Sequence, residues 1–209
     1  MKDIWQELSY VINDLGIDDF LERYSIQCNY KEGLYCLTST NDSPVAHWIT
    51  RACNGVILSY DDYFHIEAVG LERIFEFGDY DAIELHSKFD WSQSVLEHYL
   101  GGEFVKLFYF QGNWILSTDT DPTGGRTRLK FWETFGKVGE STEDLDPEKI
   151  YIYELGDNYL ELFAARWADT FQEIDLYESY ITIPQYPLGC EGRIIKDVNG
   201  NRMMLRKYV

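Results

Sequence analysis

The N-terminal part of the chain carries apolar side chains at helical spacing. They recur every three or four positions, at Ile4, Trp5, Leu8, Val11, Ile12 and Leu15. This spacing is typical of one face of an amphipathic helix, and Gly16 is a suitable stop. A second short helix is predicted over residues 18–24. We therefore predict a helical N-terminal extension covering residues 1–30.

After this extension the pattern changes to short runs of alternating or apolar residues separated by turn residues, which is typical of β-strands. Strands are predicted over 34–38, 55–60 and 63–69. Hairpins are predicted over 103–110 with 113–118, 150–155 with 159–165, and 194–197 with 202–206. The turns of these hairpins contain Gln111-Gly112, Asp157-Asn158 and Asn199-Gly200. Residues 128–138 are predicted to be helical. Many strands with interspersed helices indicate an antiparallel α+β fold, organised as a single domain over 1–209.

Composition agrees with a packed, strand-rich body, since 16% of the 209 residues are aromatic. No apolar run has the length of a membrane span, so no membrane association is expected. The four cysteines, Cys28, Cys36, Cys53 and Cys190, show no paired spacing. We expect reduced thiols in a cytoplasmic protein, and no zinc site.

Charge restricts the possible partners. Asp and Glu number 36 against 18 Lys and Arg, a formal net charge of −18. Proteins that hold a phosphate backbone gain affinity through Lys and Arg, which release counterions. Nonspecific nucleic-acid binding is therefore disfavoured by long-range repulsion, although a local basic groove is compatible with this balance. By itself, the net charge indicates an acidic cytoplasmic protein and does not identify a partner.

Six short segments follow one another in a recognisable order. They are RACNGVIL at 51–58, RIFEFGD at 73–79, EHYLGG at 97–102, YIYEL at 151–155, EGRII at 191–195 and RMMLRKY at 202–208. In this order they resemble the motifs of T4-type RNA ligases, within the covalent nucleotidyltransferase family. The family pattern runs from an R-G strand through P-K-F-F-N-x-G-E, E-K-x-D-G-S, F-E-L and E-G-x-V to K-x-K. The resemblance implies the antiparallel-sheet nucleotidyltransferase (RNA/DNA ligase-like) domain.

The resemblance also implies roles for individual residues. In the family a lysine attacks the α-phosphate of ATP and forms a phosphoramidate, while cations stabilise the developing charge. One glutamate holds the ribose and another supports a divalent metal. Carried onto this sequence, the nucleophile position is His98 and the metal-supporting position is Glu191. The nucleotide-binding positions are Arg51, Asn54, Glu154 and Arg206. ATP and Mg²⁺ are the cofactors implied if the protein is active.

The departures from the family pattern remove positive charge. Histidine (His98) replaces the lysine and Asn54 replaces an arginine. Asp119 follows Ser117-Thr118 where the family has S-T-R-G, Met204 stands at a lysine position, and Leu100 replaces an aspartate. We therefore predict a degenerate ligase-like protein that lacks self-adenylylation. It would act as a binding or interaction module for a nucleotide, RNA or a protein partner.

Two other functions stay open. The first is an active nucleotidyltransferase that uses His98 or a displaced lysine, with Glu191 supporting Mg²⁺. Lys106 lies further along the predicted hairpin strand and is poorly placed to replace the nucleophilic lysine of the family. If Lys88 is aligned with that lysine instead, bulky Trp91 stands where the family has glycine. The second is an acidic decoy that blocks the nucleic-acid-binding surface of a partner.

Fuller ligases carry a C-terminal specificity domain after the last motif, and because this sequence stops just after that motif we expect no such domain here. Small ligases of this type are frequent in phages and large viruses. A viral or phage origin is therefore implied, with localisation in the host cell cytoplasm.

Overall fold

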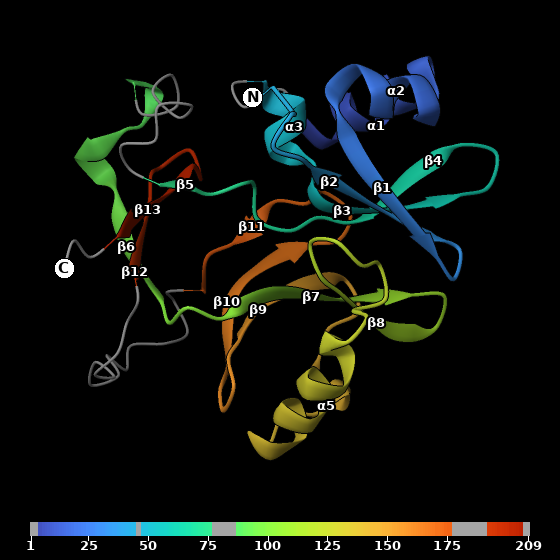
Figure 1. Cartoon of the computed structure of the whole chain (residues 1–209). Helices are drawn as coiled ribbons and strands as arrows, with labels where there is room; N and C mark the ends of the chain where they lie inside the picture. Colours follow the sequence, from blue (N-terminus) through green and yellow to red (C-terminus); the bar gives the residue numbers. More distant parts are fainter. Residues whose placement is uncertain (1–3, 45–46, 77–86, 177–191, 207–209) are drawn as a thin grey trace.

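The structure is a computed structural model, and it describes residues 4–44, 47–76, 87–176 and 192–206. Within these residues the strands form three sheets, all antiparallel except for one parallel pair (Figure 1). The α+β class and the predominance of antiparallel pairing were predicted correctly.

Two helices begin the described chain, as the apolar spacing predicted. They are α1 (Ile4–Leu15) and α2 (Ile17–Tyr24). The buried face of α1 consists of Trp5, Leu8 and Ile12. The predicted helical extension over 1–30 is too long, because residues from Ile26 onward form a strand. Ser25, with φ of 52° in the left-handed region, ends α2 and turns the chain into that strand.

The first sheet has the order β1-β2-β3-β4. Its strands are β1 (Ile26–Lys31), β2 (Leu34–Ser39), β3 (Asn54–Tyr60) and β4 (Phe64–Ala68). A short helix, α3 (Trp48–Ala52), lies between β2 and β3. Arg51 was interpreted as part of a strand and is in this helix instead. The helix begins where His47 Nδ1 accepts a hydrogen bond from the Ile49 amide at 3.2 Å, which satisfies one of the free N–H groups of a helix start.

The second sheet has the order β11-β10-β9-β7-β8. Its strands are β7 (Glu103–Phe110), β8 (Asn113–Ser117), β9 (Lys149–Leu155), β10 (Leu160–Trp167) and β11 (Glu173–Ile174). The helix α5 (Thr127–Lys137) and the 3-10 turn η3 (Thr142–Asp144) connect β8 to β9. Two predicted hairpins, β7–β8 and β9–β10, and the predicted helix α5 are thus confirmed.

The third sheet has the order β5-β13-β12-β6 and gathers distant segments. Its strands are β5 (Phe75–Glu76), β6 (Val95–Tyr99), β12 (Gly192–Lys196) and β13 (Arg202–Arg206), with the 3-10 turn η2 (Trp91–Gln93) preceding β6. The predicted β12–β13 hairpin is confirmed. Strand β6, which contains the residue at the predicted nucleophile position, pairs with β12 along its whole length.

The core lies between four layers (Figure 1). Helices α1–α3 cover one face of the first sheet, where Leu8, Ile12 and Phe20 are fully buried. The other face of that sheet packs on the second sheet through residues such as Ile57 and Phe108. Helix α5 covers the far face of the second sheet. The first and second sheets therefore form a sandwich with helices outside, and the third sheet stands beside it.

Other predictions concern membranes and thiols. No helix among the described residues is long and apolar enough to cross a membrane. Within the same residues Cys28, Cys36 and Cys53 are free thiols, as predicted, while Cys190 lies outside them. Burial raises the pKa of the Cys36 thiol to about 11, and it raises the pKa of Cys53 further. Both thiols are therefore protonated and unreactive at neutral pH.

Candidate functional site

A cavity lies where the three sheets meet. Its volume is about 220 Å³. Strands β3, β6, β7, β9 and β13 and the segments after β4 and β8 line it, through Asn54, Gly70, Leu71, Arg73, Ile74, Tyr99, Phe104, Lys106, Asp119, Ile152 and Met204. Most of these side chains are apolar or aromatic, with a small polar group at one wall. Such a lining is typical of small-molecule sites.

Lys106 is the central polar group of the cavity. The residue is 1% exposed, although a charged side chain is rarely buried so fully without a partner. Its Nζ donates to the Thr118 carbonyl at 3.0 Å and to Asp119 Oδ1 at 2.9 Å. The ammonium is thus hydrogen-bonded and paired with a carboxylate whose side chain is 37% exposed. The pair is electrically neutral.

The backbone approaches this lysine closely at Gly55. The register of β2 and β3 shifts at Leu37/Thr38, which leaves Gly55 as the extra residue of a β-bulge with φ of 76°. A Cβ atom built on Gly55 would lie 2.5 Å from Lys106 Nζ and 2.7 Å from Asp119 Cα. Glycine is therefore needed here both for conformation and for space.

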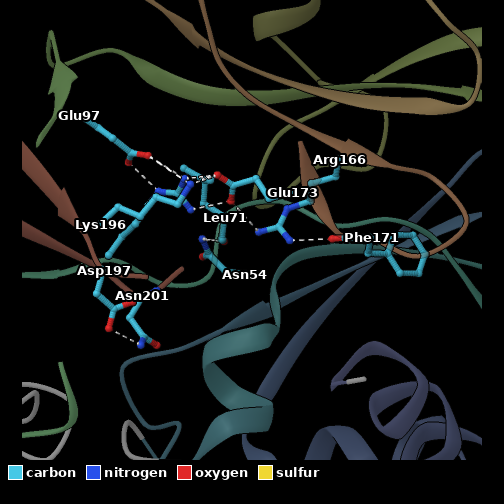
Figure 2. Close-up of polar contacts among 10 residues, drawn as sticks. Asn54, Leu71, Glu97, Arg166, Phe171, Glu173, Lys196, Asp197 and Asn201 are labelled. Carbon is cyan, nitrogen blue, oxygen red and sulfur yellow. Dashed lines mark hydrogen bonds and ion pairs between the residues drawn. The ribbon is translucent and has the colours of Figure 1, made fainter. Parts of the chain in front are cut away.

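Asn54 lines the cavity but has an internal partner. Its Nδ2 donates to the Leu71 carbonyl at 3.1 Å (Figure 2). This bond fixes the segment that follows β4 against the start of β3. Arg73, on the same segment, donates from Nη1 to the Thr40 carbonyl at 3.3 Å and lies 5.3 Å from the Phe75 ring centroid. Both polar side chains thus hold the cavity wall in position.

Glu154 holds a turn. Its Oε1 accepts hydrogen bonds from the Leu100 amide at 2.9 Å, the Gly102 amide at 2.7 Å and the Tyr159 hydroxyl at 2.8 Å. Burial and the bond to Glu154 raise the pKa of Tyr159 well above its ordinary value, so Tyr159 is a stable donor. The other oxygen, Oε2, is buried without a partner among the described residues.

Glu154 also belongs to the sheet face that lines the cavity. Phe104 pairs with Glu154 and Lys106 pairs with Ile152 across β7 and β9. Residues two apart in a strand share one face. The carboxylate therefore lies on the same side of the second sheet as Phe104, Lys106 and Ile152.

The other predicted site residues fall in different places. Arg51, in α3, does not line the cavity, and its Nε is buried without a hydrogen-bond partner among the described residues. His98 pairs with Arg193 in the third sheet, and Arg206 pairs with Gly192. The side chains of His98 and Arg206 lie outside the described part of the structure, as does the whole of Glu191.

Tyr99 and Lys106 are cavity residues with polar groups that were not selected from the sequence. Tyr99, directly after His98, lines the cavity, and its ring stacks on Phe104 at 5.6 Å. Lys106 was set aside because of its position in the hairpin strand. The hairpin register contained a signal, however, since Lys106 pairs with Ser117 and Asp119 follows two residues later. A lysine between buried positions, with an aspartate near its partner, indicates a buried ion pair.

A buried ion cluster joins the third sheet to the second (Figure 2). Arg202 on β13 binds Glu97 on β6 through Nε at 2.7 Å and Nη2 at 2.9 Å. It also binds Glu173 on β11 through Nη1 at 3.0 Å and Nη2 at 2.7 Å. Lys196 Nζ lies 2.5 Å from Glu173, and Arg166 lies 3.7 Å from it. The cluster thus fixes β6 and β13 against the edge of the second sheet.

Glu173 makes the stability of the protein sensitive to acid. Burial opposes its ionisation, but hydrogen bonds and charges from Arg202, Arg166 and Lys196 outweigh this and lower its pKa from 4.5 to about 2. The unfolded chain therefore takes up a proton at higher pH than the folded chain. We expect the free energy of unfolding to fall as the pH decreases from about 4.5 towards about 2. Urea titrations across this range measure it.

A matched variant isolates the contribution of this carboxylate. Glu173→Gln should be less stable than the parent at neutral pH, and the difference between the two proteins should shrink as the pH falls. If the difference in unfolding free energy between the two proteins stayed constant over this pH range, Glu173 would not be the source of the acid sensitivity.

No group of three or more His, Cys, Asp or Glu residues arranged to hold a metal ion occurs in the described ranges, which do not include Glu191. The predicted role of Glu191 toward Mg²⁺ therefore remains a prediction.

Comparison with protein-family models and with curated proteins finds no match for this sequence. Among solved structures the chain is similar to an archaeal ATP-dependent RNA ligase in two forms. Form 2 has a TM-score of 0.53 over 98% of this chain, and form 1 has a TM-score of 0.51 over 96%, each at 12% identity. A putative ATP-dependent DNA ligase from Aquifex aeolicus has a TM-score of 0.49 at 14% identity, over 91% of this chain and 61% of that one.

These likenesses concern the fold. The chain has an α+β ligase-like nucleotidyltransferase fold, as the sequence motifs predicted. It spans 64% of the length of the archaeal ligase. At this level of identity, the activity of that ligase does not transfer to this chain.

Proposed function

We propose that the protein is a degenerate ligase-like binding module that holds a nucleoside-type ligand without forming a covalent nucleotide intermediate. The observation that carries the proposal is the state of Lys106. It is the one lysine among the described residues that line the cavity. Its ammonium group donates hydrogen bonds to Asp119 and to the Thr118 carbonyl. A nucleophilic lysine must instead present a free amine to phosphorus.

The cavity favours a ligand of low charge. The pairing of Lys106 with Asp119 leaves no excess positive charge on that wall, so Arg73, which donates to the Thr40 carbonyl, is the other cation of the described lining. One guanidinium does not neutralise a triphosphate, and the chain as a whole has a net charge of −18. The volume of about 220 Å³ is also below the roughly 300–1,000 Å³ of typical ligand sites. A nucleobase with its ribose is a better match in size and charge than ATP.

Glu154 supports a ribose-bearing ligand. Its Oε2 is a buried acceptor without a partner among the described residues. An unsatisfied buried acceptor costs about 1–3 kcal/mol, which a hydroxyl donor from a ligand would recover. Glu154 is not itself part of the cavity lining, but it lies on the same face of the second sheet as the lining residues Phe104 and Ile152, so a ribose hydroxyl that reached past them would be a suitable donor. Tyr99 and Phe104 supply the aromatic surface on which a base can stack.

A second candidate function rests on the same lysine. If Asp119 took the proton of the Lys106 ammonium at 2.9 Å, the neutral amine could attack the α-phosphorus of ATP. An N–P bond would form and pyrophosphate would leave, giving a lysyl phosphoramidate. This is the displaced-lysine alternative, with Lys106 in place of the family lysine.

A labelling experiment separates the two functions. The protein is incubated with α-³²P-labelled ATP or GTP and Mg²⁺ or Mn²⁺, then denatured and tested for an acid-labile adduct. We expect no adduct. An adduct that disappears in Lys106→Ala would establish the second candidate, and one that disappears in His98→Ala would assign the nucleophile to the histidine.

Binding is measured separately by thermal shift and calorimetry with adenosine, AMP and ATP. We expect affinity to decrease as phosphates are added, because each adds negative charge beside a neutral ion pair. The matched variants are Glu154→Gln, which should weaken adenosine binding, and Glu133→Gln on the exposed face of α5, which should not. Tighter binding of ATP than of adenosine would refute the proposed ligand class.

A further inference from the structure

A second hollow, which shares no lining residue with the cavity, is lined by aromatic rings. It lies between α1, the β3–β4 hairpin and the loop after β10, and its volume is about 510 Å³. We call it the aromatic groove, defined by Trp5, Tyr10, Tyr63, Phe64 and Phe171. Trp5 and Phe171 meet edge to face at 6.1 Å. Tyr10 and Tyr63 are 69% and 65% exposed, so their rings are available to a partner.

The two sides of the groove are fixed to each other. Asn13 Nδ2 on α1 donates to the Phe64 carbonyl at 3.0 Å, and the Phe64 amide donates to Asn13 Oδ1 at 2.8 Å. Ser9 Oγ also reaches the Phe64 carbonyl at 3.5 Å. The groove is therefore formed before any partner arrives, which reduces the entropy cost of binding.

The segments around the groove are acidic. Residues 4–15, in α1, and 54–69 contain no Lys or Arg, and their acidic residues are Glu7, Asp14, Asp61, Asp62 and Glu67. Asp169 lines the groove, is exposed, and has no hydrogen bond or ion pair within the described residues. Arg166 lies beside the groove, but its guanidinium, 5.9 Å from the Trp5 ring centroid, donates to the Phe171 carbonyl and pairs with Glu173.

We propose that the aromatic groove is a docking surface for a lysine- or arginine-bearing segment of a partner protein. Cations bind over aromatic faces, and the surrounding carboxylates attract them from a distance. Large exposed aromatic rings are also enriched at protein interfaces. A nucleic acid would be repelled by the same carboxylates. A second copy of this chain, also with a net charge of −18, would be repelled as well.

Binding of a fluorescein-labelled hexa-arginine peptide, measured by fluorescence anisotropy at about 0.15 M salt, tests the proposal. The groove variant is Tyr10→Ala with Tyr63→Ala. The matched control is Tyr30→Ala with Tyr109→Ala, which removes two exposed tyrosines from β1 and β7. We expect the groove variant to weaken binding about tenfold and the control to change it less than about twofold. Circular dichroism checks that both variants fold.

A second pair of variants separates the groove from the general acidity of the chain. Asp169→Asn and Asp144→Asn change the net charge equally, but Asp144 lies in η3 after α5. We expect only Asp169→Asn to weaken peptide binding. Equal weakening by both would mean nonspecific attraction and would overturn the proposal. A dimer in sedimentation that the groove variant dissociates would also overturn it, because the groove would then bind a second copy.

Discussion

Arg202→Met is expected to lower the free energy of unfolding by about 3–5 kcal/mol. Arg202 is 6% exposed and is bound in a bidentate manner to both Glu97 and Glu173. Methionine fills a similar volume, but among the described residues it leaves Glu97, itself 8% exposed, with Lys196 at 3.9 Å as its one remaining cation. Removing one partner of a buried ion pair leaves a charge without compensation, and this is the costly case. Urea denaturation with linear extrapolation measures the loss.

Two further variants test the cause. Arg202→Lys keeps the charge but not the planar guanidinium that binds both glutamates. The decrease in its free energy of unfolding should therefore lie between zero and that of Arg202→Met. Lys130→Met removes the cation of an exposed ion pair with Asp157, and solvent screening should leave its unfolding midpoint nearly unchanged. If Arg202→Met and Lys130→Met had equal effects, the buried cluster would not contribute to stability as described.

Gly55→Ala is expected to lower the free energy of unfolding by about 2–5 kcal/mol. A left-handed backbone costs a residue with a side chain roughly 1–2 kcal/mol. The new methyl group would also overlap Lys106 Nζ and the backbone Cα of Asp119, and overpacking adds about 1–3 kcal/mol. Because the Asp119 Cα is part of the main chain, it cannot rotate away. The same overlap should disturb the Lys106–Asp119 pair and, with it, ligand binding in the cavity.

Gly112→Ala is the control for backbone conformation alone. Gly112 has φ of 85° in the β7–β8 turn and nothing within 4 Å of its added Cβ. We therefore expect only the conformational cost of about 1–2 kcal/mol. The difference between the two variants isolates the overlap at the cavity. An equal loss of unfolding free energy in both variants would mean that the added methyl group at Gly55 causes no overlap with Lys106 and Asp119.

Much of the fold could be predicted because local signals agreed with it. The hairpins β7–β8 and β12–β13 have glycine at the turn, and α1 has a regular apolar face. Strand β1 was missed because Ile26 is its single buried residue, so it lacks the alternation that a half-buried strand shows. The two-residue strands β5 and β11 are too short for any periodic pattern. Their place is decided by long-range pairing.

The candidate site was less predictable because it depends on contacts between distant segments. Motif order directed attention to His98, whereas the adjacent Tyr99 and the more distant Lys106 line the cavity. From the sequence, Asp119 was interpreted as standing in place of a family arginine, and therefore as the loss of a cation. Its carboxylate pairs with Lys106, so this residue is the counter-ion of a lysine in the preceding hairpin. Such compensation between two positions is visible only when the hairpin register is used to compare them.

The third sheet has a consequence for how the chain is made. Strands β5 and β6 form the two edges of this sheet and come from the middle of the sequence, whereas β12 and β13, which lie between them, come from its last part. During synthesis, the first two sheets have all their strands once residue 174 is available. Strands β5 and β6 must then wait for residues 192–206, and Glu97 must wait for Arg202, 105 residues later. This sheet is therefore expected to assemble last, with its edges exposed to chaperones or to premature association until then.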